Sequence, residues 1–365
     1  MTNPGAVDSR VRQTIDLFAD ASAAGPAGGW RLARLFGPEH GLRGDYPAGA
    51  KVPDTIDPFT GVPISSLYGD HRIPTRESLE DVDVLVVDLP QVGVRFYTKT
   101  STMANCLIAA AEHGRPIVVL DRPNPIGGVE VEGPPVEPGF ESFLGRVGWP
   151  IRLGVTLGEL ARVVNDGEGI GADLTVVKCE GWARDEWWDK TGLPWVLPSP
   201  NMPTLDCATV YPGTCLFEGT LLSEGRGTTR PFELIGAPWV EPYKWVGALA
   251  ERKLPGVTFR PQWFQPVYHK HKEVPCGGLQ VHVTDREALR PAAVAMHMIE
   301  TARDLWPKEF GWRVAAREGA VPAIDRLYGS AALRELMDGG ATAEEVIRTW
   351  EPAAFKAQRE KALLY

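Results

Sequence analysis

The run VDVLVVDL at residues 82–89 decides the fold class of this chain of 365 residues. It is an apolar stretch of strand length that closes with Asp88 and Pro90. Hydrophobicity that is continuous, rather than alternating between polar and apolar residues, is typical of a strand covered on both faces, as in a parallel sheet. We therefore expect a buried parallel strand at these residues.

The segments that follow alternate between helix and strand. Ser101–Glu112 has helical spacing, and Ile117–Leu120 is a second buried strand. Another helix is expected from Thr156, where Glu159 completes a capping box, and Asp173–Cys179 supplies the next strand. Alternation of strand and helix over about 200 residues predicts a doubly wound α/β domain.

The character of the chain changes at a tryptophan-rich stretch, set among Pro and Gly residues, which ends at Pro203. Beyond this stretch, strand patterns at Val257–Phe259 and Leu279–Val283 are combined with several helical patterns. We therefore expect one domain over residues 1–203 and a smaller α+β domain over residues 204–365.

Composition and charge restrict the partners of the protein. Lys and Arg number 38 against 47 Asp and Glu, and the formal net charge of −9 argues against the basic face that nucleic-acid binding needs. The apolar runs are far shorter than the roughly 20 residues of a membrane span. The five cysteines form no C-x-x-C pair, and His269 and His271 do not share a helical face, so no metal site is expected.

The first candidate site is GPEHGLRG at residues 37–44, directly after a short predicted strand. Ligands of open α/β sheets bind beyond the carboxyl ends of the strands, so Glu39 and His40 are well placed to contact a ligand. In a partly desolvated loop the pKa of Glu39 can rise far enough for it to act as a general acid. The alternative is a surface turn with solvated charges.

Two more strand ends are followed by polar clusters, and strand ends of this kind converge on one edge of a sheet. The candidate binding residues there are Asp88, Arg95, Tyr97, Asp121, Arg122 and Asn124. Each alone is more typical of structure, since Asp at a strand end often caps the turn. Their coincidence favours a pocket at this edge.

A fourth cluster lies in the C-terminal part, in two polar loops between residues 211 and 232. It contributes Glu218, Glu224, Arg226 and Thr228, with Gly225 and Gly227 between them. Neither a G-x-x-x-x-G-K-[ST] loop nor a G-x-G-x-x-G after a strand is present, so nucleotide binding is weakly supported. Carboxylates, an arginine and many tryptophans suit a polyhydroxylated ligand at least as well.

Long strings of the sequence resemble one bacterial family, the exo-β-N-acetylmuramidases of the NamZ type. The strings are LFGPEHGLRGD (35–45), VGVRFYT (92–98), LDRPNPIGG (120–128), PSPNMPT (198–204) and YPGTCLFEGTLLSEGRGTTRPFELIGAPW (211–239). The resemblance implies a Rossmann-like N-terminal domain without a dinucleotide or other cofactor, and a site in the cleft beside the smaller domain. The implied reaction removes N-acetylmuramic acid from the non-reducing end of peptidoglycan fragments.

The resemblance also implies roles for the candidate residues. Glu39, in the family's PEHG motif, would transfer the proton and His40 would tune or relay it. The second group is open: Glu224 or Glu218 across the cleft, Asp88 in the same domain, or the acetamido oxygen of the substrate. A guanidinium of Arg95, Arg122 or Arg226 would pair with the lactyl carboxylate of muramic acid. The remaining substrate contacts would come from Tyr97, Asp121, Asn124, Asn201 and Thr228.

Two positions depart from the family pattern. The motif Asp-x-Gln-Asp-Val-Gly corresponds here to residues 88–93, DLPQVG, which lack the second charge, and Arg-His-Gly-Met-Thr corresponds to residues 152–156, RLGVT. If Pro90, Gln91 or Leu153 touches the ligand, the preferred amino sugar could differ. A catalytically silent amino-sugar-binding protein on the same scaffold is the alternative function, and a Rossmann oxidoreductase is disfavoured by the missing glycine motif.

The start of the chain, MTNPG, resembles the turn that follows the first strand of family members. Either translation starts further upstream, or the first strand is missing, which would expose the edges of its neighbours. The stretch 1–10 is neither basic nor apolar, so the chain as written is expected in the cytoplasm. A secreted or cell-envelope location follows if the start lies upstream.

Overall fold

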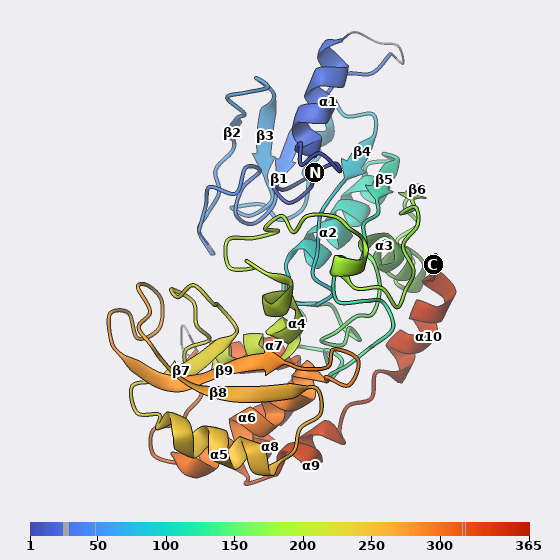
Figure 1. Ribbon diagram of the computed structural model, residues 1–365. Helices are drawn as coiled ribbons and strands as arrows, with labels where there is room; N and C mark the ends of the chain where they lie inside the picture. Colours follow the sequence, from blue (N-terminus) through green and yellow to red (C-terminus); the bar gives the residue numbers. More distant parts are fainter. Residues whose placement is uncertain (25–28, 48, 316, 318) are drawn as a thin grey trace.

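The structure is a computed structural model that describes residues 1–24, 29–47, 49–315, 317 and 319–365. It has mixed α/β architecture in two parts, with the N-terminal part above the C-terminal part in Figure 1. The elements of the N-terminal part are α1 (Thr14–Ala23), β1 (Leu35–Gly37), β2 (Thr55–Ile56), β3 (Pro63–Ser66), β4 (Leu85–Val87), α2 (Lys99–Glu112), β5 (Ile117–Leu120), α3 (Leu157–Gly167) and β6 (Leu174–Val177).

Strands β4, β5 and β6 form a parallel sheet in that order, with Leu85 opposite Ile117 and Ile117 opposite Leu174. The predicted parallel strand within residues 82–89 is therefore confirmed, although only three residues have strand geometry. Val87 is fully buried whereas Val86 is half-buried, so β4 has one face more deeply covered than the other. Helices α2 and α3 contribute to the same hydrophobic core.

The predicted helix boundaries follow local chemistry. Thr156 caps α3 by accepting the Glu159 N–H, and the Glu159 side chain accepts the Thr156 N–H, which confirms the capping box. Helix α2 ends at His113, followed by Gly114 with a φ of 60°. That left-handed conformation favours glycine and stops the helix.

A second sheet of the N-terminal part has the order β1-β3-β2. β1 and β3 are parallel, with Phe36 opposite Ser65, and β2 is antiparallel to β3. Between β1 and β4 the two sheets are not joined in the part of the chain that the structure describes.

The C-terminal part is an α+β unit, as predicted, around an antiparallel sheet of order β7-β9-β8. Its elements are α4 (Leu205–Thr214), β7 (Leu234–Ala237), α5 (Pro242–Glu251), β8 (Val257–Phe264), β9 (Cys276–Val283), α6 (Pro291–Leu305), α7 (Ala323–Tyr328), α8 (Ala332–Asp338), α9 (Ala343–Ile347) and α10 (Ala353–Ala362). Buried side chains of both parts, among them Val94 and Ala208, share one hydrophobic core.

The last helix returns to the N-terminal part, where α10 packs against α3 (Figure 1). Arg359 donates to the carbonyls of Gly128 and Gly154 at 2.6 and 2.9 Å. Helix α10 therefore links the C-terminal part to the N-terminal part. Across the described ranges, no helix combines the length and the apolar character needed to cross a membrane.

Candidate active site

A cavity of about 620 Å³ lies between the two parts of the molecule. Its polar and aromatic lining residues include Glu39, His40, Tyr68, Tyr97, Thr98, Lys99, Ser199, Asn201, Tyr211, Glu218, Arg226, Tyr268, His269, Arg313 and Arg326. Six of these were predicted from the sequence: Glu39, His40, Tyr97, Asn201, Glu218 and Arg226. The PEHG loop and the polar loop of the C-terminal part thus meet at one cavity.

Glu39 follows β1 in a tight turn. His40 and Gly41 both have positive φ, 74° and 77°. A Cβ on Gly41 would lie 2.8 Å from the ring of Tyr46, so this position requires glycine. The turn therefore fixes the backbone on which Glu39 is presented to the cavity.

The Glu39 carboxylate is held by two donors. The Thr98 hydroxyl donates to Oε2 at 2.7 Å, and the Gly49 N–H donates to Oε1 at 3.1 Å. The Nζ of Lys99 donates to the backbone carbonyl of Glu39 at 2.8 Å. Because Thr98 and Lys99 stand at the start of α2, the helix that follows β4 positions the loop that follows β1.

The pKa of Glu39 is lowered, contrary to the raised value expected from its loop. Burial alone raises the pKa, but the Thr98 hydrogen bond, the charge of Lys99 and the Gly49 N–H outweigh it, and His40 adds to the lowering only when its imidazole is protonated. The sequence showed the concave loop and did not show these partners. Glu39 is therefore a carboxylate, ready to accept a proton.

His40 is buried and its pKa is lowered by burial and by the charge of Lys99. Its Nδ1 lies 3.0 Å from the carbonyl oxygen of Tyr46, which can only accept, so Nδ1 carries the proton. The imidazole is thus neutral, and Nε2 is left with a lone pair. Such a group can accept or relay a proton beside Glu39.

Arg226 and Glu218, which both line the cavity, form an ion pair. The Nη2 and Nε of Arg226 donate to Oε1 of Glu218 at 2.6 and 3.0 Å. The Arg226 guanidinium also stacks over the ring of Phe232, 5.0 Å from its centroid. Glu218 remains partly exposed, so its carboxylate can meet a ligand.

Glu224 is fully buried behind this pair and is not among the described residues that line the cavity. Its carboxylate contacts the Nζ of Lys270 at 2.8 Å and the Nδ1 of His269 at 3.0 Å, and Arg226 at 3.5 Å. Burial opposes ionisation, but these cations hold the pKa of Glu224 down to about 2. Glu224 therefore supports the cationic side of the cavity, in contrast to the predicted position facing Glu39.

Tyr97 and Asn201 line the cavity between these two groups. Asn201 Oδ1 accepts a hydrogen bond from the Tyr268 hydroxyl at 2.7 Å, which orients the amide toward the ligand space. Burial raises the pKa of Tyr97, so its hydroxyl stays protonated. Tyr97 and Asn201 are therefore suited to bind sugar hydroxyl or acetamido groups.

Asp88 and Arg122 are placed away from the cavity. The Arg122 guanidinium binds Asp88 at 2.5 and 2.8 Å, and the Thr14 hydroxyl donates to the same carboxylate at 2.6 Å. These contacts tie α1 to the ends of β4 and β5. The predicted substrate contact of Asp88 and Arg122 therefore finds no support in the geometry.

Asp121 and Asn124 likewise serve the fold. Asp121 accepts from the Thr156 hydroxyl at 2.6 Å and from the Gly158 N–H at 2.7 Å, at the start of α3. Asn124 is fully buried and donates to the Val155 carbonyl at 3.0 Å. The polar groups that follow these strands are hydrogen-bonded to neighbouring residues. The convergence of strand ends had predicted instead that they line a pocket.

Arg95 and Thr228 also lie outside the cavity lining in the described ranges. Arg95 is fully buried and donates to the Leu327 carbonyl at 2.7 Å, and burial lowers its pKa to about 9. The Thr228 hydroxyl donates to the Gly225 carbonyl at 2.6 Å. Both side chains stabilise loops around the site.

The two departures from the family pattern do not reach the cavity. Leu153 is buried in the core of the N-terminal part, and Pro90 and Gln91 border a separate small pocket beside Arg122 and Trp188. The altered sugar preference that depended on ligand contact at these positions is therefore not supported.

Sequence reasoning missed several lining residues: Tyr68, Thr98, Lys99, Tyr268, His269, Arg313 and Arg326. Thr98 is the last residue of VGVRFYT and Lys99 directly follows it, and a lysine in the first turn of an otherwise buried helix was the available signal. Arg326 stands in an unremarkable helix with no such signal. Among the described residues, no group of three His, Cys, Asp or Glu side chains could hold a metal ion.

Comparisons with known proteins identify relatives over the whole chain. Residues 1–206 match the family described as exo-beta-N-acetylmuramidase NamZ, N-terminal, and residues 209–365 match its C-terminal counterpart. The peptidoglycan beta-N-acetylmuramidase NamZ of Bacillus subtilis (strain 168) is 44% identical over 367 positions, covering 100% of this chain and 86% of that protein.

Two crystal structures of DUF1343 family proteins from Bacteroides fragilis NCTC 9343 are also similar. One has 36% identity and a TM-score of 0.90, and the other has 29% identity and a TM-score of 0.75. Each match covers 100% of this chain and 92% of the crystallised chain. The chain therefore belongs to the exo-beta-N-acetylmuramidase NamZ family.

Proposed function

We propose that this protein is a glycoside hydrolase that releases N-acetylmuramic acid from the non-reducing end of peptidoglycan fragments. The observation that carries the proposal is the ionised Glu39 carboxylate on the wall of a cavity between the two parts of a NamZ-family chain. The curated relative from Bacillus subtilis, named as a peptidoglycan beta-N-acetylmuramidase, supports the same reaction. Because Glu39 keeps two donors and an adjacent imidazole, a silent sugar-binding protein is not favoured.

The finer description of the fold is part of this proposal. The N-terminal domain is Rossmann-like, and the parallel strand order β4-β5-β6 supports this description. We do not expect it to bind a dinucleotide, because the sequence lacks the glycine-rich loop. The division at residues 203 and 204 is supported by the family matches, which end at 206 and begin at 209.

Glu39 is the proton-transfer residue of the proposed mechanism. It starts as a carboxylate, and a sugar filling the cavity would remove water and raise its pKa toward the range in which it shares a proton with the glycosidic oxygen. His40, neutral and with a lone pair on Nε2, can take up a proton from water at Nε2 and pass that proton to the Glu39 carboxylate, which returns the imidazole to its neutral form. Protonation of the leaving oxygen is the step that this pair supplies.

The group facing the anomeric carbon is either Glu218 or the acetamido oxygen of the substrate. Glu218 lines the cavity, and its carboxylate accepts hydrogen bonds from Arg226 while remaining partly exposed. Glu224 is fully buried and is not among the described residues that line the cavity. Between the sequence-based candidates, the geometry therefore favours Glu218 over Glu224 and Asp88.

The lactyl carboxylate of muramic acid needs a cation on the cavity wall. Arg226 is already neutralised by Glu218 and Glu224, whereas Arg326 lines the cavity with no ion pair to a described residue. Arg313 lies on the same wall. Arg326 is therefore the proposed carboxylate-binding residue, with Arg313 beside it.

Replacing Arg326 by Gln is expected to lower kcat/KM at least about 10-fold for a β-N-acetylmuramic acid glycoside, because one charge-assisted hydrogen bond is lost. The matching N-acetylglucosamine glycoside, which has no lactyl group, should be affected far less. The control is Arg10→Gln, at an exposed arginine that is far from Arg326 in the sequence. Equal losses on both glycosides would show that Arg326 does not read the carboxylate.

Hydrolysis of the two chromogenic glycosides by the unaltered protein tests the proposed function itself. Release of the chromophore from the N-acetylmuramic acid glycoside, well above release from the N-acetylglucosamine glycoside, is expected. Binding of the sugar without release from either would establish the silent binding protein instead.

A further inference from the structure

Lys99 is a buried cation on the wall of the Glu39 cavity. It is 1% exposed, and its Nζ donates to the backbone carbonyl of Glu39 at 2.8 Å. Burial lowers the pKa of Lys99 to about 8, and the charge of Glu39 only partly offsets that effect. Lys99 forms no ion pair with a residue that the structure describes, although buried lysines are normally paired.

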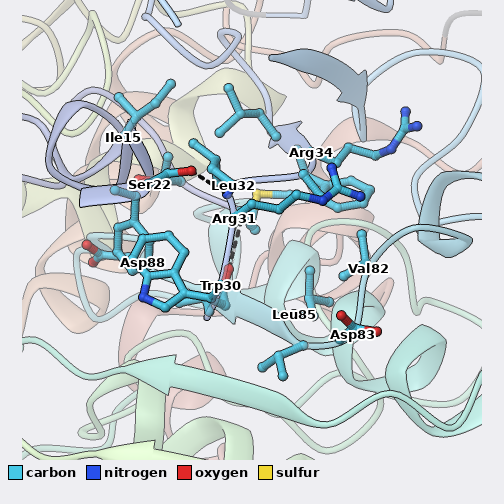
Figure 2. A pocket seen from close by; sticks show the side chains of 18 of the residues that line it. Ile15, Ser22, Trp30, Arg31, Leu32, Arg34, Val82, Asp83, Leu85 and Asp88 are labelled. Atoms are coloured by element: carbon cyan, nitrogen blue, oxygen red, sulfur yellow. Dashed lines mark hydrogen bonds between the residues drawn. The ribbon is translucent and has the colours of Figure 1, made fainter. Parts of the chain in front are cut away.

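A larger cavity of the N-terminal part shows the usual arrangement of charges. It has a volume of about 780 Å³, lies between α1, β1 and β4, and shares no described lining residue with the Glu39 cavity (Figure 2). Its charged side chains are either exposed, as Arg31 and Asp83 are, or paired, as Asp88 is with Arg122. Lys99 is neither exposed nor paired, so the adjacent site explains its position better than the fold does.

The start of α2 is an unfavourable place for this charge. Lys99 is the first residue of the helix, whose N-terminal end carries the positive end of the helix dipole, and the first turn holds no acidic residue. Thr98 has the N-cap position, but its side chain makes no capping hydrogen bond, and its hydroxyl donates to Oε2 of Glu39 instead. Two consecutive residues therefore contact Glu39 without stabilising the helix that they begin.

The charge of Lys99 acts on both Glu39 and His40. A nearby positive charge stabilises an ionised carboxyl group and destabilises an ionised imidazole, so it lowers the pKa of both groups. Lys99 is among the causes that lower the pKa of Glu39 and the pKa of His40. It therefore favours a carboxylate beside a neutral imidazole.

The other charged or titratable groups that face this pair do not replace Lys99. They are Arg226 in the C-terminal part, Tyr68 after β3 and Tyr97 before α2. Arg226 is paired with Glu218, and a raised pKa keeps each tyrosine uncharged. Among the described groups that face the pair, Lys99 is therefore the cation without an ion-pair partner.

We propose that Lys99 is a positioning residue for the hydrolysis, and that its ammonium group sets the charge state in which Glu39 and His40 meet the substrate. The inference rests on the proposed function of the Glu39 cavity. With Lys99 charged, Nε2 of His40 keeps the lone pair that takes up a proton, and the Glu39 carboxylate can receive that proton. Without this charge, the pair in the free protein would take up a proton at a higher pH.

The test measures the pKa of His40 by NMR titration of its imidazole, which needs no substrate. Lys99→Met removes the charge at similar side-chain length, and the pKa of His40 is expected to rise by about 1. Lys99→Arg, which keeps the charge, should leave that pKa close to its value in the unaltered protein. The control Lys308→Met, at an exposed lysine, should do the same. The His40 signal is the one missing from His40→Asn, because Asn tolerates the φ of 74° at this position.

Kinetics show whether the charge of Lys99 reaches the reaction. With the β-N-acetylmuramic acid glycoside as substrate, the limb of the kcat/KM pH profile that reports the Glu39–His40 pair should move to higher pH by about one unit in Lys99→Met. Lys99→Arg should restore the profile. If Lys99→Met does not fold, Lys99→Gln, whose amide can still donate to the Glu39 carbonyl, gives the same comparison.

Three outcomes would overturn the inference. An unchanged His40 pKa in Lys99→Met would show that the charge does not act on the pair. A loss of kcat/KM that is equal at every pH would assign Lys99 a purely structural role. A higher KM with an unchanged pH profile would make Lys99 a substrate-binding residue. If the unaltered protein does not hydrolyse the glycoside while the His40 pKa still rises in Lys99→Met, the proposed function is wrong and the effect of the Lys99 charge stands.

Discussion

Turnover of a β-N-acetylmuramic acid glycoside is expected to fall at least about 100-fold when Glu39 is replaced by Gln. This is the usual scale on which loss of a positioned acid–base group slows a reaction. Gln has nearly the same shape as Glu: its amide oxygen can accept the Gly49 N–H, which lies 3.1 Å from Glu39, and its NH2 group can donate to the Thr98 hydroxyl oxygen, which lies 2.7 Å from Glu39. The loss should therefore appear in kcat and leave the fold unchanged.

The control for this change is Glu80→Gln, at an exposed glutamate of the same domain. It should have normal kcat, and thermal unfolding of both variants should match that of the unaltered protein to within a few degrees. Near-normal turnover of the Glu39 variant would remove this residue from the proton-transfer role.

A large loss of stability is expected from Glu224→Gln. The change removes the one carboxylate that Lys270 and His269 share, so the ammonium group of Lys270, whose side chain is largely buried, loses its ion-pair partner. Breaking a buried pair in this way costs about 3 kcal/mol of unfolding free energy. Lys270 keeps its hydrogen bonds to the carbonyls of Phe217 and Thr220, which limits the cost.

The pH dependence of that loss identifies its source. The pKa of Glu224 is depressed to about 2 in the folded protein, so its contribution is fully present above the unfolded glutamate value of 4.5. It is lost as the pH falls through about 2. The stability difference between the two proteins, measured by urea unfolding, should therefore be constant at neutral pH and shrink in acid.

Glu251→Gln, at an exposed helix position of the same part, is the matched control and should change stability little. If Glu224→Gln instead abolished turnover while unfolding normally, Glu224 would act on the substrate directly and the assignment to Glu218 would be wrong. A stable, active variant would show that the cationic cluster tolerates the loss of its carboxylate.

The parts of the fold that could be predicted from the sequence are those for which one local signal was sufficient. The apolar run around Leu85, the capping box of Thr156 and the glycine after His113 each specify backbone geometry over a few residues. The path of α10 was not accessible. Its attachment depends on Arg359 reaching the carbonyls of Gly128 and Gly154, which lie more than 200 positions earlier in the chain.

The site could be predicted from the sequence only in part, because a polar residue after a strand can either line a cavity or bind neighbouring groups of the fold. Glu39 remains at the cavity since its partners, Thr98 and Gly49, orient it without covering it. Asp88 and Asp121 have the same position relative to their strands, but their carboxylates accept hydrogen bonds from buried hydroxyl and backbone groups. Sequence alone does not distinguish these outcomes, because the partners come from distant segments.

The central claim is that Glu39 acts on a terminal N-acetylmuramic acid. The most direct measurement is digestion of a peptidoglycan tetrasaccharide with N-acetylmuramic acid at its non-reducing end, followed by mass spectrometry, with the unaltered protein and Glu39→Gln side by side. We predict that the unaltered protein releases free N-acetylmuramic acid and leaves the trisaccharide, while the variant leaves the tetrasaccharide intact. Internal cleavage to disaccharides, or equal release by both proteins, would contradict the account.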